Sequence, residues 1–261
     1  VAANVVSGSK WRDFFSRETG FCRFEPGDIP GLDNLVEIGQ EIYSARGGKA
    51  AARPEGNPFL PLLNKADFDT HPEILKIALS RPIVEIMCGY FGTVPRLDRV
   101  DLWVTSPNGD DADGFGSQLY HLDKPGQHYT SLFLNVFDVE EENGPLVFLP
   151  ADKTAMVRRA TRYEKLYYLG NGRLPDQDLF AHVEPSELIH LNGPSGTGAL
   201  VDTSECFHCG SRCTAGTRVL FVLSFMPAHK GGPPGFKNFP HSSSSTDSLT
   251  RLFLKAPPGD G

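Results

Sequence analysis

The second part of the chain consists of many short apolar runs separated by turns, and this pattern most constrains its fold. The 27 glycines and 21 prolines supply residues for those turns. The run 99–104 alternates polar and apolar residues, as expected of a half-buried strand. Further strands are predicted over 118–123, 129–136, 145–149, 187–191, 198–202 and 218–225. This pattern favours a β-sandwich or closed barrel over a parallel α/β sheet.

The residues before this region carry helical patterns instead. Amphipathic spacing is found over 9–15, 32–45 and 70–92. In the last of these, Thr70 is the expected N-cap, Pro82 is expected to kink or split the helix, and Gly92 is expected to end it. We therefore expect a mainly helical layer over 1–95 and a β core over 96–227 within a single domain.

Two further segments differ from this β core. Residues 151–184 form the longest interval between predicted strands, and we expect a partly helical insertion there. The insertion carries Arg158, Arg159, Arg162, Tyr163, Tyr167 and Tyr168. Such a group usually forms a solvated helix face, but it would favour an anionic or polar substrate if it covered the mouth of the barrel. Residues 228–261 are rich in Gly, Pro and Ser and are predicted to form a loose tail.

Composition excludes several classes of protein. The chain has 25 basic and 32 acidic residues, a formal charge of −7, and no Lys/Arg cluster, which argues against a nucleic acid partner. No run of about 18 apolar residues is present, so we expect no membrane span. The odd count of 5 cysteines does not suggest a secreted disulfide framework, and no signal-peptide pattern is visible. A cytoplasmic location is therefore expected.

The clearest chemical signal is the sequence Gln-Leu-Tyr-His-Leu-Asp at 118–123. In a strand, His121 and Asp123 point to the same face and can bind one metal ion. His208 follows a predicted strand late in the chain, and Arg218 opens the next apolar run. Two imidazoles and one carboxylate form the facial triad of non-haem iron(II) oxygenases, which leaves positions open for a 2-oxoacid and O2. A distant arginine can then bind the far carboxylate of the 2-oxoacid through its bidentate fork.

This order of residues resembles the phytanoyl-CoA dioxygenase-like branch of the Fe(II)- and 2-oxoglutarate-dependent oxygenases. The matching stretches are 120–123, 131–139, 142–150, His208 and Arg218. Within 142–150, an Asn-Gly-Pro-Leu turn leads into a strand that ends in proline, which is characteristic of this branch. The resemblance covers roughly residues 60–227, which is most of the chain.

The resemblance implies a mainly β fold with packed helices, namely a double-stranded β-helix, or jelly roll. It implies that His121, Asp123 and His208 are the iron ligands and the catalytic residues, and that Arg218 anchors 2-oxoglutarate. Fe(II) would be the cofactor, with 2-oxoglutarate and O2 as cosubstrates. The expected reaction is hydroxylation of a small organic substrate, coupled to decarboxylation of 2-oxoglutarate to succinate and CO2.

The chain departs from the usual family pattern in two places. Pro150 is followed by Ala151 rather than by Gly-Ser-His, which alters the adjoining loop but no expected iron ligand. Gly210 and Ser211 follow the distal histidine, so hydroxyl contacts to 2-oxoglutarate would come from Ser211, Thr130 or Ser131, or be missing. Further candidates for cosubstrate or supporting contacts are Gln118, Tyr120 and Asn135.

Other functions remain open from the sequence. A cluster of Cys206, His208, Cys209 and Cys213 has the ligand types of a zinc site, although a single short loop rarely forms a structural one. A zinc hydrolase or a cupin-like metal-binding protein without oxygenase activity would use the same barrel. Neither would require Arg218, which is the feature that favours the oxygenase.

Two local motifs compete for a metal-binding role. His128 lies five residues beyond Asp123 and is the main rival ligand, although we expect it in a turn or against substrate. The segment 108–114 is rich in Asp and Gly and hints at a calcium loop, but it lacks the later spaced carboxylate. We therefore expect a solvated loop there. The sequence does not indicate the prime substrate or the oligomeric state.

Overall fold

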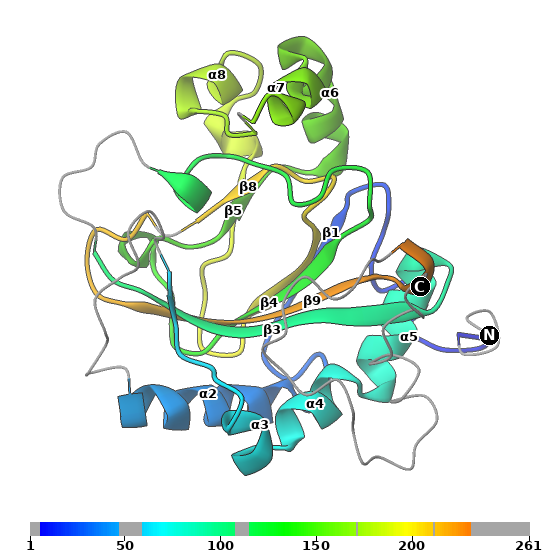
Figure 1. The fold of residues 1–261 in the computed structure, drawn as a ribbon, viewed down its shortest axis with the longest axis vertical. Coiled ribbons are helices and arrows are strands. Elements are labelled where there is room, and N and C mark those ends of the chain that lie inside the picture. The colour runs from blue at the N-terminus through cyan, green and yellow to red at the C-terminus, as the bar shows by residue number, and fades with distance from the viewer. Residues whose placement is uncertain (1–5, 47–58, 108–114, 171, 211, 231–261) are drawn as a thin grey trace, which may run out of the picture.

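Two antiparallel sheets face each other in the computed structural model, which describes residues 6–46, 59–107, 115–170, 172–210 and 212–230 (Figure 1). The larger sheet contains β1 (Phe21–Phe24), β2 (Leu60–Pro61), β3 (Pro95–Thr105), β4 (Thr130–Asn135), β7 (Gly198–Asp202) and β9 (Arg218–Pro227). Its strand order is β1-β7-β4-β9-β3-β2. The smaller sheet contains β5 (Val147–Phe148), β6 (Ile189–His190) and β8 (His208–Cys209), in the order β6-β5-β8.

Alternation along β9 shows how the larger sheet separates two environments. Val219, Phe221, Leu223 and Phe225 belong to the core between this sheet and the helices. Arg218, Leu220, Val222 and Ser224 line a cavity on the other face, between the sheets. Because successive side chains of a strand point to opposite faces, one strand builds both the core and the cavity wall.

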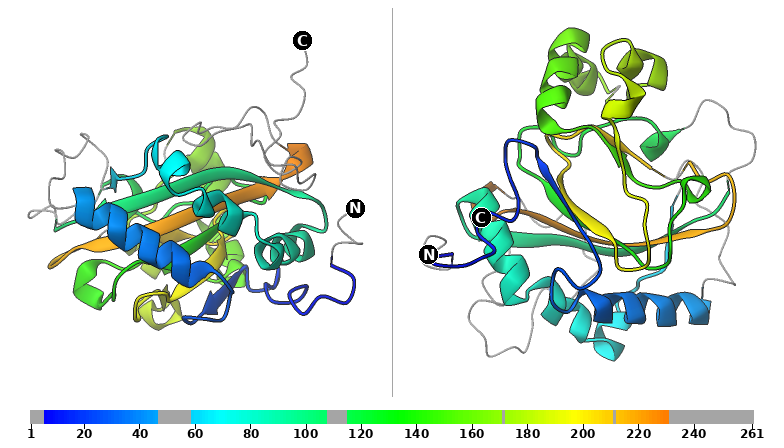
Figure 2. Two further views of the ribbon diagram at one scale, coloured as in Figure 1. Left: turned by 90° about the horizontal axis from the view of Figure 1, so that it is seen from below. Right: turned by 180° about the vertical axis from the view of Figure 1, so that it is seen from behind.

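Helices cover the outer face of the larger sheet (Figures 1 and 2). They are α2 (Leu32–Arg46), α3 (Asp67–Thr70), α4 (Glu73–Ala78) and α5 (Arg81–Phe91). Helix α2 matches the predicted helix closely. The helix predicted over 70–92 is divided into α4 and α5, and Pro82 lies in the first turn of α5, where its missing N–H costs no helical hydrogen bond. Gly92 ends α5 with a φ of 66°.

Two details of the helical layer differ from the predictions. Thr70 ends α3 and does not cap α4, which begins after Pro72 without a side-chain cap. Residues 9–15 form turns rather than a helix. Their aromatic residues Trp11 and Phe15 are nevertheless buried in the core, and Phe15 stacks on Tyr90 at 3.9 Å. The amphipathic pattern therefore indicated burial, which a series of turns can also provide.

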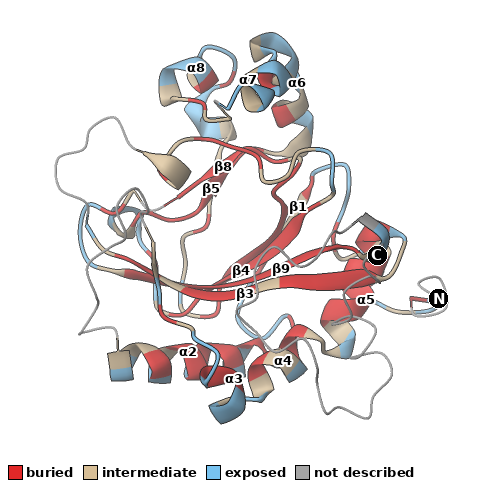
Figure 3. Cartoon of the chain, viewed as in Figure 1, coloured by how far each residue is buried: buried red, intermediate tan, exposed pale blue. Residues whose placement is uncertain are grey.

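A second group of helices covers the outer face of the smaller sheet and corresponds to the predicted insertion. These helices are α6 (Ala151–Thr161), α7 (Tyr163–Tyr168) and α8 (Asp176–Phe180). They lie at the opposite end of the molecule from α2 (Figure 1). Most of their outer surface is exposed, whereas Val157, Tyr163 and Leu179 are buried against the smaller sheet (Figure 3).

The strand predictions were correct in position but less so in length. Strand β7 has the predicted bounds, whereas β3 and β9 are longer and β5 and β6 shorter. The segment 118–123 is not a regular strand: a short 3-10 helix (Gly116–Gln118) is followed by isolated bridges at Tyr120 and His121. Strands β1, β2 and β8 were not predicted, because each is too short to show an alternating pattern.

The remaining short elements are 3-10 helices. They cover Glu141–Asn143, Pro185–Glu187 and Ala228–Lys230. Of the predicted tail, only its first three residues lie within the described chain. Within that described part, no helix is both long and apolar enough to cross a membrane.

Candidate metal centre

Backbone pairing brings His121, Asp123 and His208 together from segments far apart in the sequence. His121 and His208 form a bridge in which each N–H donates to the other residue's carbonyl, at 3.0 and 3.1 Å. The N–H of Asp123 donates to the carbonyl of Thr203 at 2.8 Å. These bonds fix the segment that carries the H-x-D motif against the segment leading to β8.

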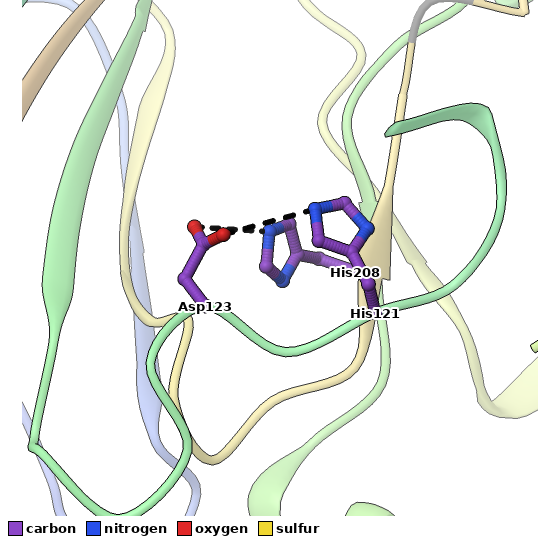
Figure 4. Close-up of side chains that lie close together, drawn as sticks. All are labelled: His121, Asp123 and His208. Atoms are coloured by element: carbon purple, nitrogen blue, oxygen red, sulfur yellow. Dashed lines mark ion pairs between the residues drawn. The ribbon is translucent and has the colours of Figure 1, made fainter. Parts of the chain in front are cut away.

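The three side chains converge on one point (Figure 4). His208 Nε2 lies 3.5 Å from one carboxylate oxygen of Asp123, and His121 Nε2 lies 3.9 Å from the other. The imidazole centroids are 4.2 Å apart. One donor atom from each residue lies within 4.8 Å of the other two. This separation suits a single metal ion bound by two nitrogens and one oxygen.

Main-chain carbonyls determine which nitrogen of each imidazole can bind a metal. Nδ1 of His121 donates to the carbonyl of Leu119 at 2.9 Å, and Nδ1 of His208 donates to the carbonyl of Cys206 at 3.1 Å. A neutral imidazole carries one proton, so both Nε2 atoms keep their lone pairs directed toward Asp123. Such supporting bonds orient ligating histidines in metal sites.

The protonation states also favour a bound cation. Burial, together with the neighbouring His208, lowers the pKa of His121 to about 3. Burial alone would raise the pKa of Asp123, but the adjacent imidazoles of His208 and His121 and a hydrogen bond from the Thr203 side chain hold it well below its usual range. At neutral pH the site therefore offers an uncharged His121 and an ionised carboxylate, which are the states that bind metal.

Arg218 lies in the same cavity as these three residues. Its side chain is 2% exposed, and burial lowers its pKa to about 10. A Cβ atom added to Gly210 would lie 3.3 and 3.4 Å from the two terminal nitrogens of Arg218. Glycine at this position therefore leaves room for the guanidinium beside β8. The cavity therefore contains both the three candidate metal ligands and the buried positive charge of Arg218.

Aromatic residues form a further wall that the sequence did not indicate. Phe59 stacks on Trp103 with ring centroids 4.6 Å apart and an angle of 17°. The guanidinium of Arg99 lies 4.6 Å from the Trp103 ring and pairs with the carboxylate of Asp101. Phe59, Arg99 and Trp103 all line the cavity. Arg99 and Trp103 belong to one face of β3, but only the register of the sheet shows that this face is the cavity face.

Only some of the candidate supporting residues lie at the cavity. Ser131 lines it and shares a hydrogen bond with Ser224 at 2.8 Å. Thr130 is the preceding residue of β4 and is directed to the other face. Gln118 accepts a hydrogen bond from the N–H of Phe115 and thus caps the first 3-10 helix. Ser211 lies outside the described residues.

Two other candidates contribute to packing. Tyr120 belongs to the cluster on the outer face of the smaller sheet, where its ring meets Phe180 edge to face. The Asn135 side chain donates to the carbonyl of Leu191 at 3.2 Å. Neither residue is among those that line the cavity.

The rival metal ligands are placed elsewhere. His128 has a φ of 54°, and its Nδ1 lies 3.9 Å from the buried carboxylate of Asp202. The Cys206 thiol contacts main-chain carbonyls of the N-terminal segment, and Cys209 packs in the outer cluster. Among the described residues, His121, Asp123 and His208 form the one group with metal-binding geometry. The possible calcium loop at 108–114 is outside the described chain.

Arg158, Arg159 and Arg162 of the predicted insertion are not among the residues that line the cavity. Arg158 forms ion pairs with Glu164 and Glu205, at 2.7 and 2.6 Å. These bonds hold α6 and α7 to the segment before β8. Arg159 is exposed at the end of α6. The group is therefore partly structural and partly solvated, as its sequence pattern suggested.

Comparisons with known proteins identify the architecture. No family model matches the chain, and no curated protein matches it by sequence. Among solved structures, iron-bound EctD from S. alaskensis aligns with a TM-score of 0.54 at 13% identity, over 82% of this chain and 74% of that chain. The fold is a jelly roll. This confirms the predicted fold class.

Two other solved structures share the fold and contain bound molecules. SnoN, an epimerase in complex with Fe3+, alpha ketoglutarate and nogalamycin RO, aligns with a TM-score of 0.51 at 14% identity, over 94% of this chain and 88% of that chain. HygX from Streptomyces hygroscopicus, with nickel and 2-oxoglutarate bound, aligns with a TM-score of 0.50 at 16% identity, over 80% of this chain and 83% of that chain.

Proposed function

We propose that this protein is an Fe(II)- and 2-oxoglutarate-dependent dioxygenase of the phytanoyl-CoA dioxygenase-like branch, which hydroxylates a small organic substrate. The observation that carries the proposal is the presence of two histidines, one aspartate and a buried arginine in a single cavity. A protein that only binds metal has no need of the arginine. The same assignment is supported by the iron in the EctD structure, the Fe3+ and alpha ketoglutarate in the SnoN structure, and the nickel and 2-oxoglutarate in the HygX structure.

The donor set fits iron(II). His121 and His208 would bind through Nε2 and Asp123 through its carboxylate, which leaves part of the coordination sphere for 2-oxoglutarate and O2. Bound iron would supply O2 activation coupled to decarboxylation of 2-oxoglutarate to succinate and CO2. The carbonyls of Leu119 and Cys206 keep the Nδ1 protons in place, so neither ring has to change tautomer when the metal binds.

Arg218 would bind the carboxylate of 2-oxoglutarate that is remote from the metal. Its guanidinium can form two parallel hydrogen bonds with that group, and burial strengthens them because water does not compete. Ser131 and Ser224 offer hydroxyls on the same wall. The cosubstrate would thus extend from the metal bound by His121, Asp123 and His208 toward Arg218 on β9.

Apolar side chains would limit access of water to the reacting groups. Phe133, Leu146, Leu220 and Val222 line the cavity beside the metal corner. An apolar surrounding strengthens the electrostatic interactions within the site and disfavours unproductive reactions. The prime substrate would approach along the Phe59–Trp103 wall, where stacked rings present an apolar surface suited to an organic molecule.

Succinate formation provides the decisive test. The purified protein with Fe(II), 2-oxoglutarate and ascorbate is expected to release succinate, and His121→Ala is expected to lose both stoichiometric metal and succinate formation. Arg218→Lys keeps the positive charge but cannot form two parallel hydrogen bonds with a carboxylate. This variant should therefore retain metal and bind 2-oxoglutarate about ten- to a hundredfold more weakly. Metal binding by the wild type without any binding of 2-oxoglutarate would contradict the proposal and favour a metal-binding jelly roll.

A further inference from the structure

The segment 172–174 lies beside the segment that carries the H-x-D motif. Tyr120 and Leu174 form an antiparallel bridge, with N–H to carbonyl distances of 3.0 and 2.8 Å. One step further along the same register, the Tyr163 hydroxyl accepts from the N–H of Leu122 and donates to the carbonyl of Gly172. This register places Arg173 directly opposite His121.

Directly opposed residues of an antiparallel pair point to the same face. His121 is in turn opposite His208, so Arg173, His121 and His208 form a row across three adjacent segments. Their neighbours Tyr120, Leu174 and Cys209 all belong to the cluster on the outer face. The row is therefore directed to the inner face, where the side chains of His121 and His208 line the cavity, and Arg173 lies next to the cavity without being among its lining residues.

Arg173 differs from Arg158 and Arg212, the other two half-buried arginines beside the smaller sheet, in lacking an acidic partner among the described residues. Arg158 is paired with Glu164 and Glu205, and Arg212 is paired with Asp176 at 2.6 Å. Arg173 is half-buried, and its Nη1 atom is shielded from solvent without a hydrogen-bond partner in the described chain. A shielded donor of this kind lowers stability until an acceptor satisfies it.

Among carboxylates, that of Asp123 has the strongest electrostatic effect on Arg173. Burial lowers the pKa of Arg173, whereas the charge of Asp123 raises it. If Asp123 binds a metal cation, that carboxylate is neutralised and the guanidinium retains an uncompensated positive charge beside the site. A guanidinium in this state is suited to bind a carboxylate or phosphate group through two parallel hydrogen bonds.

We propose that Arg173 binds an anionic group of the prime substrate, a carboxylate or a phosphate, and holds the substrate next to the metal centre. The proposal rests on the proposed function and makes Arg173 a specificity-determining residue. Arg218 and Arg173 would then have separate roles, because they lie on different sides of the metal centre. Arg218 lies on β9 in the larger sheet, whereas Arg173 lies on the segment that pairs with His121 on the side opposite His208.

Anion binding to the nickel-loaded protein tests this role without turnover. Acetate, inorganic phosphate and sulfate are titrated by calorimetry into protein saturated with Ni(II) and 2-oxoglutarate, and chloride serves as the reference ion. At least one of the three anions is expected to bind the wild type. Arg173→Gln should weaken that binding at least about tenfold, and Arg173→Lys should have an intermediate effect. The matched control is Arg159→Gln, which removes an exposed arginine from α6 and should leave binding unchanged.

Other outcomes would overturn the proposal. The proposal is wrong if the wild type binds none of the three anions. It is also wrong if Arg173→Gln and Arg159→Gln bind them equally well. A loss of 2-oxoglutarate affinity in Arg173→Gln would show that the arginine binds the cosubstrate, and a loss of nickel would show that it positions the ligands. If the wild type binds nickel but no 2-oxoglutarate, the proposed function fails, and the same titration without 2-oxoglutarate still tests Arg173.

Discussion

At the candidate metal centre, burial keeps His121 uncharged. Its side chain is 8% exposed and lies beside a second imidazole, and the pKa is lowered to about 3. In the unfolded chain a histidine has a pKa of about 6.5. Between these two values the unfolded state binds a proton that the folded state does not, so acid favours unfolding.

The metal-free protein should therefore lose stability as the pH falls from about 6.5 toward 3. His121 can contribute up to about 1.4 kcal/mol per pH unit in this window, since one proton is involved. In His121→Asn this part of the slope should vanish, while the contributions of ionised carboxylates such as Asp98 remain. Urea unfolding of metal-free protein at several pH values measures the difference. Equal slopes in the two proteins would show that His121 titrates normally in the folded state.

The residues that converge at the candidate metal centre could be identified from the sequence because they form a short motif and a recurring order. His121 and Asp123 are two positions apart, and His208 precedes Arg218 at a recognisable distance. Arg173 and Trp103 could not be identified in this way. Trp103 lines the cavity and Arg173 lies opposite His121 only because of the register between segments far apart in the chain, which leaves no local pattern.

Among the elements, α7 supports the irregular segment that carries the H-x-D motif. Tyr163, at the start of α7, is fully buried, and its hydroxyl bridges the main chains of Leu122 and Gly172. This segment has few ladder bonds of its own because it is not a regular strand. A side chain from the insertion thus replaces missing backbone pairing.

Tyr163→Phe should lower the free energy of unfolding by about 1–3 kcal/mol, because it leaves the buried N–H of Leu122 and the partly buried carbonyl of Gly172 without this partner. It should also weaken metal binding, since the segment of His121 and Asp123 becomes less well held. Thermal unfolding and nickel titration measure the two effects. Tyr168→Phe is the control, since that side chain is 85% exposed. An unchanged unfolding temperature in Tyr163→Phe would contradict this role.

The elements themselves were predictable where the pattern was long. The 15 residues of α2 and the 10 of β9 carry several periods of their apolar repeat. Strand β8 has only 2 residues, and its pairing with β5 is fixed by the rest of the barrel. Such short elements gain their order from tertiary contacts, so the local sequence does not reveal them.

For the molecule as a whole, the larger sheet has one face for stability and one for binding. Leu223 is fully buried on the helix side, whereas Val222 lines the cavity. Leu223→Ala should cost about 2–5 kcal/mol of unfolding free energy, because it leaves a void in the packed core. Val222→Ala should cost less and instead alter ligand affinity, because it enlarges a space that already exists.

Urea unfolding and 2-oxoglutarate titration distinguish these two faces. Leu169→Ala is the control, since this leucine is 72% exposed and should change stability by less than about 0.5 kcal/mol. If Leu223→Ala altered ligand affinity more than Val222→Ala, the division of the sheet into two functional faces would be wrong.

The position of β9 also has a consequence for synthesis on the ribosome. This strand lies between β3 and β4 in the larger sheet, yet it follows every other strand along the described chain. Until residue 227 has emerged, β3 and β4 present unpaired edges to chaperones and to other nascent chains. The sheet and the cavity are therefore completed in one late event, which adds the central strand and Arg218 together.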